Sequence, residues 1–400
     1  MSDYHYDICV VGGAGHVGLP LALAFAAAGQ RVLIQDVNVE VMEEIKRGTM
    51  PFIEDGADPL LQEALRANRL FFSARAQDLS AARHVIVAIG TPVDEYLHPT
   101  LRALPELFTG LQPLLHPDQT IIIRSTVYPG TCRQIARMLE RGGPQWKVAY
   151  CPERIAQGFA VRELRELPQI VSGTSAAAAD AAARLFALIA PEIICVDVEE
   201  AELAKLFSNA WRYIQFGAAN QFFMIAASLG ADFTRIRDAM TRGYGRAASL
   251  PGPGFAAGPC LLKDTMQLLA FSGNNFPLGH AAMLVNEGLP AFIVDALRRS
   301  HDLSRTRVGI LGMAFKADID DTRDSLSFKL AKILRFHGAE VRCSDEHATD
   351  PSFVDKDELV RWAQVVIVGV PHAEYRMLAV PPEVDVYDMW RVLPAQVLVS

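Results

Sequence analysis

The sequence lacks the features that mark membrane, secreted and nucleic-acid-binding proteins. No uninterrupted apolar run approaches the roughly twenty residues that a membrane-spanning helix needs. The first residues, MSDYHYD, show no basic-then-apolar signal pattern, so we expect a cytoplasmic location and no membrane partner. The formal net charge of −8 argues against nucleic acid or an anionic membrane surface as the main partner.

The spacing of cysteine and histidine excludes two further kinds of site. The 6 cysteines are widely spaced and form no CxxC pair, which predicts free thiols rather than a disulfide framework or a zinc site. No group of histidines has metal-ligand spacing, and neither a P-loop nor a GxSxG pattern is present, so we expect no bound metal. With 400 residues, 50% of them hydrophobic, the chain has room for two or three domains.

A dinucleotide-binding turn is predicted close to the N-terminus. YDICVV reads as a buried strand and LPLALAFAAAG as a helix, and Gly13, Gly15 and Gly18 lie between them in the pattern G-x-G-x-x-G. These glycines allow a tight turn, the approach of a pyrophosphate and close packing of helix on strand. The next strand ends at Asp36, whose carboxylate would bind a ribose diol and repel a 2′-phosphate, which favours NAD over NADP. An ordinary glycine turn followed by a surface aspartate is the alternative.

A second candidate for chemistry is Cys260, in the run GPGFAAGPCLLKD (252–264). This cysteine lies between a loop rich in glycine and proline and a helix-like segment, and a helix N-terminus and the nearby Lys263 would favour the thiolate form. Asp264 follows four residues later and would share a helix face with Cys260. The alternative is an inert structural cysteine. A dinucleotide site together with a reactive cysteine points to redox chemistry with a covalent intermediate.

Alternating strand-like and helix-like stretches predict an α/β fold for the first half of the chain. The strand-like runs occupy 84–90, 120–126, 147–153 and 192–198. Such alternation indicates a parallel sheet with helices on both faces. Short polar motifs follow three of these strands, and we expect them to line one crevice at the carboxyl ends of the strands. These motifs are Thr91-Pro92, Ser125-Thr126 and Pro152-Glu153.

The rest of the chain predicts a helical middle and a second α/β segment. From about Glu199 to Ala231 apolar residues recur at three- and four-residue steps, which predicts one long connecting or dimerisation helix with Gly230 as its C-cap. A second strand–helix–strand pattern starts at TRVGILGMAF. The predicted fold is two Rossmann-like, doubly wound parallel-sheet domains joined by a central helical domain with a long connecting helix. The expected domains are 1–198, 199–300 and 301–400.

A weak internal repeat supports two related sheet domains. HVIVAIGTPVDEY (84–96) resembles QVVIVGVPHAEY (364–375) in residue type and order. A repeat of this kind fits two Rossmann-like domains on either side of a helical middle. Chance similarity between two buried strands is the alternative.

Two groups of polar residues are further candidates for a site. Lys205, Asn209 and Asn220 lie near one face of the predicted long helix, where a lysine and an amide could stabilise an oxyanion or could form a solvated stripe. FKADIDDTRDS (315–325) sets Lys316 and Arg323 among carboxylates just after a strand. That segment could hold a diphosphate or could be a salt-bridged loop.

Taken together, these motifs resemble the UDP-glucose/GDP-mannose dehydrogenase family of nucleotide-sugar dehydrogenases over nearly the whole chain. The order and spacing of the motifs make the resemblance specific. They are GAGHVGLPLA (13–22), GTPVDE (90–95), STVYPGT (125–131), CPER (151–154), ELAKLFSNAWR (202–212), GPGFAAGPCLLKD (252–264), VNEGLP (285–290) and GILGMAFKADIDDTRDS (309–325). Members have an NAD domain, a helical dimerisation domain and a C-terminal domain that holds the nucleotide, in agreement with the predicted organisation.

The resemblance implies an NAD-dependent, four-electron oxidation of the C6 hydroxyl of a UDP-sugar to a uronic acid, in the service of polysaccharide biosynthesis. Cys260 would form a thiohemiacetal and then a thioester that water hydrolyses. Lys205 and Asn209 match the pair that stabilises the oxygen, and Asp264 and Thr126 match groups that position or activate water. The implied catalytic residues are Cys260, Lys205, Asn209, Asp264, Thr126 and Glu153.

The resemblance also implies the binding residues and a homodimer. The cofactor contacts are Gly13, Gly15, His16, Val17, Gly18, Asp36, Thr91, Pro92, Ser125 and Thr126. The substrate contacts are Glu153, Arg154, Lys205, Asn209, Gly254, Phe255, Phe315, Lys316 and Arg323.

The chain departs from the pattern of many UDP-glucose members at several positions. Gln157 stands where they have a second glutamate, so the hydrolysis step would depend more heavily on Asp264 or be slower. The cysteine loop reads FAAGPC where they have FGGSC, which alters the pocket beside the sugar. The CPER motif favours a UDP-N-acetylhexosamine as substrate, with UDP-glucose as the second candidate.

Two other classes of function remain as alternatives. A two-electron hydroxyacid dehydrogenase would share the first domain and the long helix, but it would need neither a thiol at Cys260 nor a third domain. A non-catalytic NAD-binding protein would not need Lys205, Asn209, Cys260 and Asp264 together.

Overall fold

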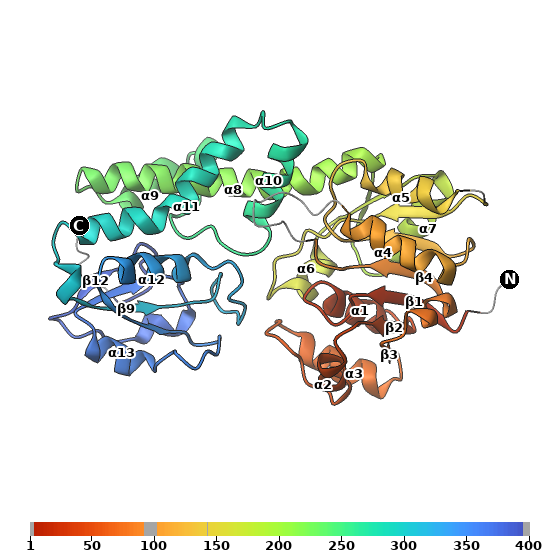
Figure 1. The fold of residues 1–400 in the computed structure, drawn as a ribbon, viewed down its shortest axis with the longest axis horizontal. Coiled ribbons are helices and arrows are strands. Elements are labelled where there is room, and N and C mark those ends of the chain that lie inside the picture. The colour runs from red at the N-terminus through yellow and green to blue at the C-terminus, as the bar shows by residue number, and fades with distance from the viewer. Residues whose placement is uncertain (1–3, 92–101, 142, 395–400) are drawn as a thin grey trace. The chain divides into compact units, whose positions relative to one another are not determined.

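The computed structural model describes residues 4–91, 102–141 and 143–394, and these residues form two compact units, Met1–Ser208 and Asn209–Ser400 (Figure 1). Pro92, an expected cofactor contact, lies outside the described residues.

The first unit is built on an eight-stranded sheet of order β3-β2-β1-β4-β5-β6-β7-β8. Its strands are β1 (Tyr6–Val11), β2 (Val32–Gln35), β3 (Leu70–Ser73), β4 (Ala82–Val87), β5 (Thr120–Ile123), β6 (Lys147–Tyr150), β7 (Gln169–Gly173) and β8 (Ile193–Cys195). Its helices are α1 (Gly18–Ala27), α2 (Val39–Lys46), α3 (Ala57–Arg66), α4 (Ala103–Leu111), α5 (Thr131–Leu139), α6 (Ala160–Glu166) and α7 (Ala176–Phe186).

The sheet is parallel except at one pair of strands. β6 and β7 run antiparallel, with Ala149 opposite Gly173 and Tyr150 opposite Ser172. The sequence analysis singled out neither β3 nor β7. Strand β7 lies between the predicted strands β6 and β8 and pairs with β8 in parallel. The predicted α/β, Rossmann-like class is confirmed, with this antiparallel pair as a departure from a wholly parallel sheet.

Two apolar layers cover the two faces of this sheet. In β1, Ile8 and Val10 point into one layer while Cys9 and Val11 point into the other, because side chains of a strand alternate between faces. Helices α1, α3 and α7 pack in the first layer, and α4, α5 and the start of α8 pack in the second. The carboxyl ends of the strands therefore lie between two helical layers, where a doubly wound fold binds its ligand.

The predicted long helix is α8 (Val198–Ser228), 31 residues long, and Gly230 with φ of 66° follows it as expected for a helix end. Its first turns are fastened to the first unit by Glu202, whose fully buried carboxylate accepts the backbone N–H groups of Gly130 at 2.6 Å and Cys132 at 2.9 Å. Those N–H groups begin α5 and have no partner within that helix, so Glu202 caps α5 from a distant segment.

The second unit consists of helices followed by a four-stranded parallel sheet of order β10-β9-β11-β12. Its helices are α9 (Phe233–Thr241), α10 (Leu261–Phe271), α11 (Pro277–Leu297), α12 (Leu326–Phe336) and α13 (Lys356–Trp362). Its strands are β9 (Arg307–Leu311), β10 (Glu340–Ser344), β11 (Val365–Val368) and β12 (Asp385–Tyr387). Helices α11 and α12 pack on one face of this sheet, and α13 packs on the other (Figure 1).

Short 3-10 segments complete the described structure. They are Ala76–Ala81, Gln112–Leu114, Gly245–Ala247, Leu303–Arg305 and Ala373–Met377.

The two sheets are built on the same plan, which confirms the weak internal repeat. β4 lies beside β1 in the first sheet, and β11 lies beside β9 in the second. Each central strand ends at a glycine with positive φ, Gly12 and Gly312, whose N–H donates to the neighbouring strand at Gln35 O and Ser344 O. The strands β4 and β11 in the two similar sequence segments therefore occupy equivalent places in the two sheets, and residues 92–96 of the first segment lie outside the described residues.

The cysteines and the helices have the following properties. None of the six cysteines, all of which lie among the described residues, is in a disulfide bond. None of the helices in the described part of the chain combines the length and the apolar character that crossing a bilayer requires.

Replacing Glu202 by glutamine tests the fastening of α8 to α5. Glutamine can accept only one of the two N–H groups and carries no charge, so we expect the free energy of unfolding to fall by about 1–3 kcal/mol. Chemical denaturation measures this value. Glu199→Gln is the control, because Glu199 pairs with Arg133 at the surface and its loss should cost less than about 1 kcal/mol. Equal losses in the two variants would contradict this account.

Candidate active site

The turn between β1 and α1 has the shape that a bound pyrophosphate needs. A side chain on Gly13 would lie 2.7 Å from Val10 O, and one on Gly18 would lie 2.3 Å from Gly12 O, so packing alone excludes any other residue there. A Cβ on Gly15 would meet only Gly12 O at 3.6 Å, an ordinary contact. Gly15 is therefore not required by the protein's own packing, and its bare backbone fits the close approach of a ligand.

Gly12 belongs to this turn but was absent from the predicted motif. Its φ of 76° is one that glycine adopts readily, and a Cβ there would lie 3.0 Å from Ala88 O. The glycine pair at 12 and 13 was the available signal, because the chosen pattern began at the second glycine. The four glycines together make the turn.

Asp36 lies beside the turn, at the end of β2. Its Oδ2 accepts the N–H of Ala14 at 3.0 Å and its Oδ1 accepts the N–H of Asn38 at 3.0 Å. Each carboxylate oxygen thus has one partner and retains a lone pair, and the residue is only partly buried. A ribose diol can donate to a carboxylate held in this way, so the residues present fit an NAD adenosine.

The other expected cofactor contacts follow β4, β5 and the glycine turn. Thr91 donates its hydroxyl to Thr126 O at 2.8 Å, and Ser125 donates to Ile89 O at 2.7 Å, which ties the loops after β4 and β5 together. Val17 is the N-cap residue of α1. These loops lie at the carboxyl ends of adjacent strands, as predicted.

Gln157 lies at the glycine turn, a position that the sequence did not reveal. Its Nε2 is 3.1 Å from Nδ1 of His16, and the His16 ring packs on Phe52 with 4.0 Å between ring centroids. The residue that replaces a glutamate therefore contacts the dinucleotide turn. Its expected effect on hydrolysis remains a prediction.

Glu153 is buried in an ion pair within the first unit. Its Oε2 pairs with the Arg124 guanidinium, which is itself 1% exposed, and its Oε1 accepts the N–H of Ile155 at 2.6 Å. Arg124 also donates to Gln169 Oε1 at 3.0 Å. Both oxygens of Glu153 have partners in the protein, which indicates that it positions the loop after β6. Its catalytic role remains a prediction, as does substrate binding by Arg154, which donates to Pro168 O.

In the second unit, Cys260 is exposed and is the N-cap residue of α10. The Cys260 side chain makes no cap hydrogen bond to the N–H groups that begin this helix. Asp264 lies one helical turn further on, and its N–H donates to Cys260 O at 2.9 Å. The predicted shared helix face is therefore present.

Asp264 is fully buried between two polar side chains. Its Oδ2 accepts from Asn209 Nδ2 at 2.6 Å, and its Oδ1 lies 3.1 Å from Lys263 Nζ. Lys263, expected to act on the thiol, therefore pairs with Asp264. Asn209 is itself 7% exposed and lies on α8, one turn after Lys205, which is 8% exposed. Burial of Lys205 and Asn209 rules out the alternative of a solvated stripe.

The loop that precedes Cys260 is held by Asn220. The Asn220 side chain accepts the Gly254 N–H at 2.8 Å and donates to Gly254 O and to Asn286 Oδ1, both at 2.9 Å. Asn286 in turn donates to Tyr213 O at 3.0 Å. Both asparagines are fully buried. The proposed oxyanion role does not suit Asn220, because its amide is committed to the backbone of the loop.

Close packing also restricts this loop. A Cβ on Gly254 would lie 1.8 Å from the Trp390 ring, and φ at Gly254 is 151°. Phe255, an expected substrate contact, is 7% exposed and packs in the core that covers the second sheet.

The segment after β9 lies against the cysteine loop. A Cβ on Gly258 would lie 2.5 Å from the Phe315 ring, and the Gly258 N–H donates to Asp324 O at 3.4 Å. Arg323 is paired with Asp321 at 2.6 Å, and this hydrogen bond chiefly raises the pKa of Arg323 above its usual value, with Cys260 as a further cause. Lys316 lies half-buried in the same segment. The structure thus brings the segment that carries Phe315 and Arg323 next to the cysteine loop.

A cluster of potential metal ligands in this unit was not apparent from sequence spacing. Asp318, His347 and His372 each offer an atom within 4.8 Å of the others, and they follow three different strands. His372 Nδ1 accepts the Asp318 N–H at 3.0 Å, and Nε2 lies 3.0 Å from Asp345 Oδ2. Because both ring nitrogens are occupied, His372 ties the loops together in this structure.

Replacing Asp36 by alanine tests the assignment of the cofactor. We expect the wild-type protein to bind NADH more tightly than NADPH, and the Asp36→Ala variant to lose about 1–3 kcal/mol of that discrimination with the ribose hydrogen bonds. Dissociation constants from nucleotide fluorescence measure it. Asp58→Ala, an exposed aspartate on α3, is the control. Equal affinity of the wild-type protein for the two nucleotides would contradict the assignment of NAD as the cofactor.

Replacing Asn220 by aspartate tests the support of the cysteine loop. A carboxylate would face Gly254 O and Asn286 Oδ1 without donors, so we expect a loss of stability of about 2–3 kcal/mol. We also expect a changed alkylation rate at Cys260, followed by mass spectrometry of its peptide. Asn275→Asp, at an exposed position, is the matched control. An alkylation rate and stability equal to those of the control would show that Asn220 does not hold the loop.

Comparison with known proteins places this geometry in a family. The model of the UDP-glucose/GDP-mannose dehydrogenase family matches the chain in three parts, the NAD binding domain over 6–188, the central domain over 199–288 and the UDP binding domain over 309–395. The UDP-N-acetyl-D-mannosamine dehydrogenase of Pyrococcus horikoshii is 30% identical over 375 residues, which cover 91% of this chain and 89% of that protein.

Solved structures agree with the family match. The structure of the UDP-D-ManNAc dehydrogenase from Pyrococcus horikoshii has a TM-score of 0.90 and 28% identity, over 98% of this chain and 97% of that chain. A UDP-glucose dehydrogenase from Pyrobaculum islandicum has a TM-score of 0.89 and 27% identity, over 98% and 95%. The glycine turn, Asp36 and the thiol at the start of α10 thus have their explanation: the chain belongs to the UDP-glucose/GDP-mannose dehydrogenase family of NAD-dependent nucleotide-sugar dehydrogenases.

Proposed function

We propose that this enzyme oxidises the C6 hydroxyl of a UDP-N-acetylhexosamine to the uronic acid in two successive steps. The observation that carries the proposal is the exposed Cys260 at the N-terminus of α10, one helical turn from the buried Asp264. Several relatives are named UDP-N-acetyl-D-mannosamine dehydrogenase, which supports the N-acetylated sugar. The similar structure of a UDP-glucose dehydrogenase makes UDP-glucose the second candidate.

The chemistry needs a nucleophile that retains the intermediate aldehyde. Oxidation of the alcohol gives an aldehyde, to which the Cys260 thiolate adds to form a thiohemiacetal. Oxidation of the thiohemiacetal gives a thioester, and water then releases the carboxylate and the thiol. NAD⁺, when bound, accepts one hydride in each oxidation, so two NAD⁺ are reduced for each sugar.

The residues around the thiol have defined parts in this proposal. Asp264 is held by Asn209 and Lys263 on the helix that Cys260 begins, so it is oriented to position water for the thioester. Asn209 has a second N–H available after its bond to Asp264, and together with Lys205 it would stabilise the oxyanion. Thr126 and Glu153 complete the proposed catalytic set.

The finer expectations from the sequence are part of the same proposal. They are the domain bounds 1–198, 199–300 and 301–400, the homodimer, the cytoplasmic location and the substrate contacts Glu153, Arg154, Lys205, Asn209, Gly254, Phe255, Phe315, Lys316 and Arg323. The contact of the Phe315 and Arg323 segment with the cysteine loop supports the last of these.

Stoichiometry tests the covalent route. With limiting UDP-N-acetylmannosamine and excess NAD⁺, we expect two NADH and one acid for each sugar, measured by NADH absorbance and mass spectrometry. Cys260→Ala should abolish the second oxidation while preserving the fold, because the side chain is exposed and caps no helix. Cys195→Ala, at the other exposed cysteine, is the control and should retain both oxidations.

Two results would overturn the proposal. A single NADH and a free aldehyde would indicate a two-electron dehydrogenase, and normal turnover by the Cys260→Ala variant would exclude the thiol. The same assay with UDP-glucose and UDP-N-acetylgalactosamine tests the substrate assignment independently of the mechanism. If another sugar is preferred but still yields two NADH, only the proposed substrate is wrong and the covalent mechanism stands.

A further inference from the structure

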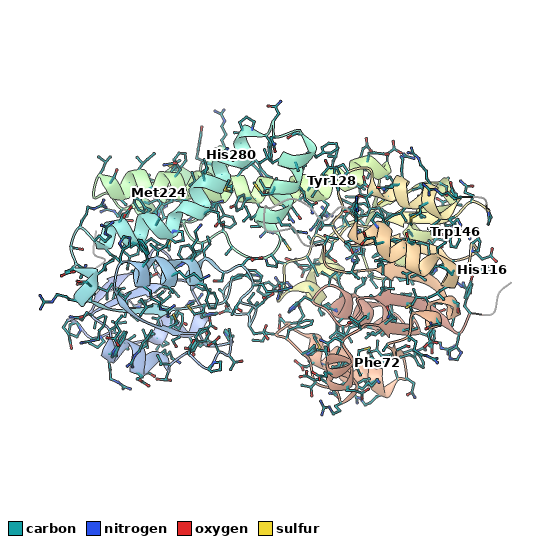
Figure 2. The ribbon with its side chains drawn as sticks, viewed as in Figure 1. Phe72, His116, Tyr128, Trp146, Met224 and His280 are labelled. Carbon is teal, nitrogen blue, oxygen red and sulfur yellow. The ribbon has the colours of Figure 1, made fainter. Side chains whose placement is uncertain are left out.

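A second pocket lies in the first unit, at the amino-terminal edge of the sheet. It has a volume of about 330 Å³. Its lining residues come from the segments that begin β2, β4, β5 and β6 and from the end of α7; they are Gln30, Arg83, His84, Asp118, Thr120, Lys147, Ala181, Arg184, Leu185 and Leu188. Figure 2 labels His116 and Trp146, which precede β5 and β6 near this edge. The cofactor turn lies at the opposite, carboxyl-terminal edge.

Strand register builds the floor of this pocket. His84, Thr120 and Lys147 are direct partners across β4, β5 and β6, so their side chains point to the same face of the sheet. Neighbouring parallel strands lie about 5 Å apart, which sets three polar side chains in a rigid row. The pocket is therefore part of the sheet framework and not a gap between mobile loops.

The pocket is positively charged in an acidic protein. Arg83, Lys147 and Arg184 line it together with one carboxylate, Asp118, which leaves two net positive charges. Within the described residues, neither Arg83 nor Arg184 has a carboxylate within 4.0 Å, so their charges are not neutralised by the protein. Lys147 Nζ donates to the backbone Asp118 O at 3.1 Å, which fixes the ammonium at the pocket.

One wall of the pocket is apolar. Ala181, Leu185 and Leu188 form it, and Leu188 is 49% exposed. A ligand that meets both walls needs an anionic group and an apolar portion. The volume lies at the lower end of the range of roughly 300–1,000 Å³ for small-molecule sites.

We propose that this pocket binds a small organic phosphate monoester, with its phosphate on Arg83, Lys147 and Arg184 and its organic portion on Leu185 and Leu188. A phosphate monoester carries close to two negative charges at neutral pH, which matches the charge of the pocket. Guanidinium groups bind phosphate oxygens through two parallel hydrogen bonds, and a lysine supplies a further point charge. The site lies at the edge of the sheet opposite the glycine turn, so it would add an effector site to the enzyme.

His84 provides a reporter inside the pocket. The pKa of His84 is lowered to about 4, chiefly by burial and also by the positive charges of Arg83, Lys147 and Arg184, which outweigh the opposite effect of Asp7. The ring is neutral at pH 7, and its buried Nδ1 has no hydrogen-bond partner among the described residues. A bound phosphate would favour the protonated ring, so the pKa of His84 should rise when the pocket is filled.

Calorimetry with phenyl phosphate tests the site on the full-length enzyme. Saturating NAD⁺ and UDP are present throughout, so that the known binding sites are blocked. We expect saturable binding, weakened roughly tenfold or more in Arg83→Gln and in Arg184→Gln. Arg66→Gln, at an exposed position on α3, is the matched control and should bind as the wild-type protein does. Inorganic phosphate should bind several-fold more weakly than phenyl phosphate, because it cannot contact the leucine wall.

A second measurement follows His84 directly. In NMR spectra of histidine-labelled protein, phenyl phosphate should raise the pKa of the signal that His84→Gln removes. Absence of saturable binding at millimolar phenyl phosphate, or equal binding by the two pocket variants and the control, would overturn the proposal. Equal affinity for inorganic phosphate would also contradict it, because the apolar wall would then have no part in the site.

Discussion

The chemistry of the second unit depends on a buried amide that replaces missing backbone partners. The loop before Cys260 contains several glycines and prolines and forms no helix or strand, so its backbone groups must find partners elsewhere. Asn220 supplies both a donor and an acceptor to Gly254, in the way that a neighbouring strand would. The thiol can be exposed and still have a defined position because the backbone six residues earlier is fixed inside the protein.

Helix α8 carries three such buried anchors, each within its own unit. Glu202 caps α5, Asn209 binds Asp264, and Asn220 holds the cysteine loop. A buried polar group without a partner is costly, so each anchor strongly favours one arrangement of the segments it joins. Helix α8 therefore supplies buried polar anchors to its surroundings in addition to its apolar surface.

The two related sheets each have an aspartate at the same place, but only one of these carboxylates is accessible to a ligand. Asp36 and Asp345 occupy equivalent places, and each accepts backbone N–H groups of the turn after its central strand. Burial would raise the pKa of Asp345, but His372 and the N–H groups of Ala314 and Ala348 hold it below its usual value. The Asp345 side chain is inaccessible to solvent, whereas Asp36 is partly exposed and can accept a ribose diol.

Local patterns in the sequence determined the elements of this protein. The glycine turn, the long helix, helix α10 and the repeated strand unit all follow from spacing and periodicity, because backbone conformation responds to neighbours within a few residues. For the same reason Cys260 and Asp264 could be placed on one helix face. The motif order was also sufficient to indicate the family.

The tertiary structure determined which side chains contact one another. Four side-chain contacts could not be read from local patterns, because they join residues distant in sequence or depend on side-chain direction. They are Lys263 with Asp264, Gln157 with His16, Glu153 with Arg124 and Asn220 with Gly254. The antiparallel β7 was missed because a short strand in a mixed sheet has no pattern of its own. Which polar group is free to act depends on which partners the fold brings within about 3 Å, and that distance is not contained in local sequence.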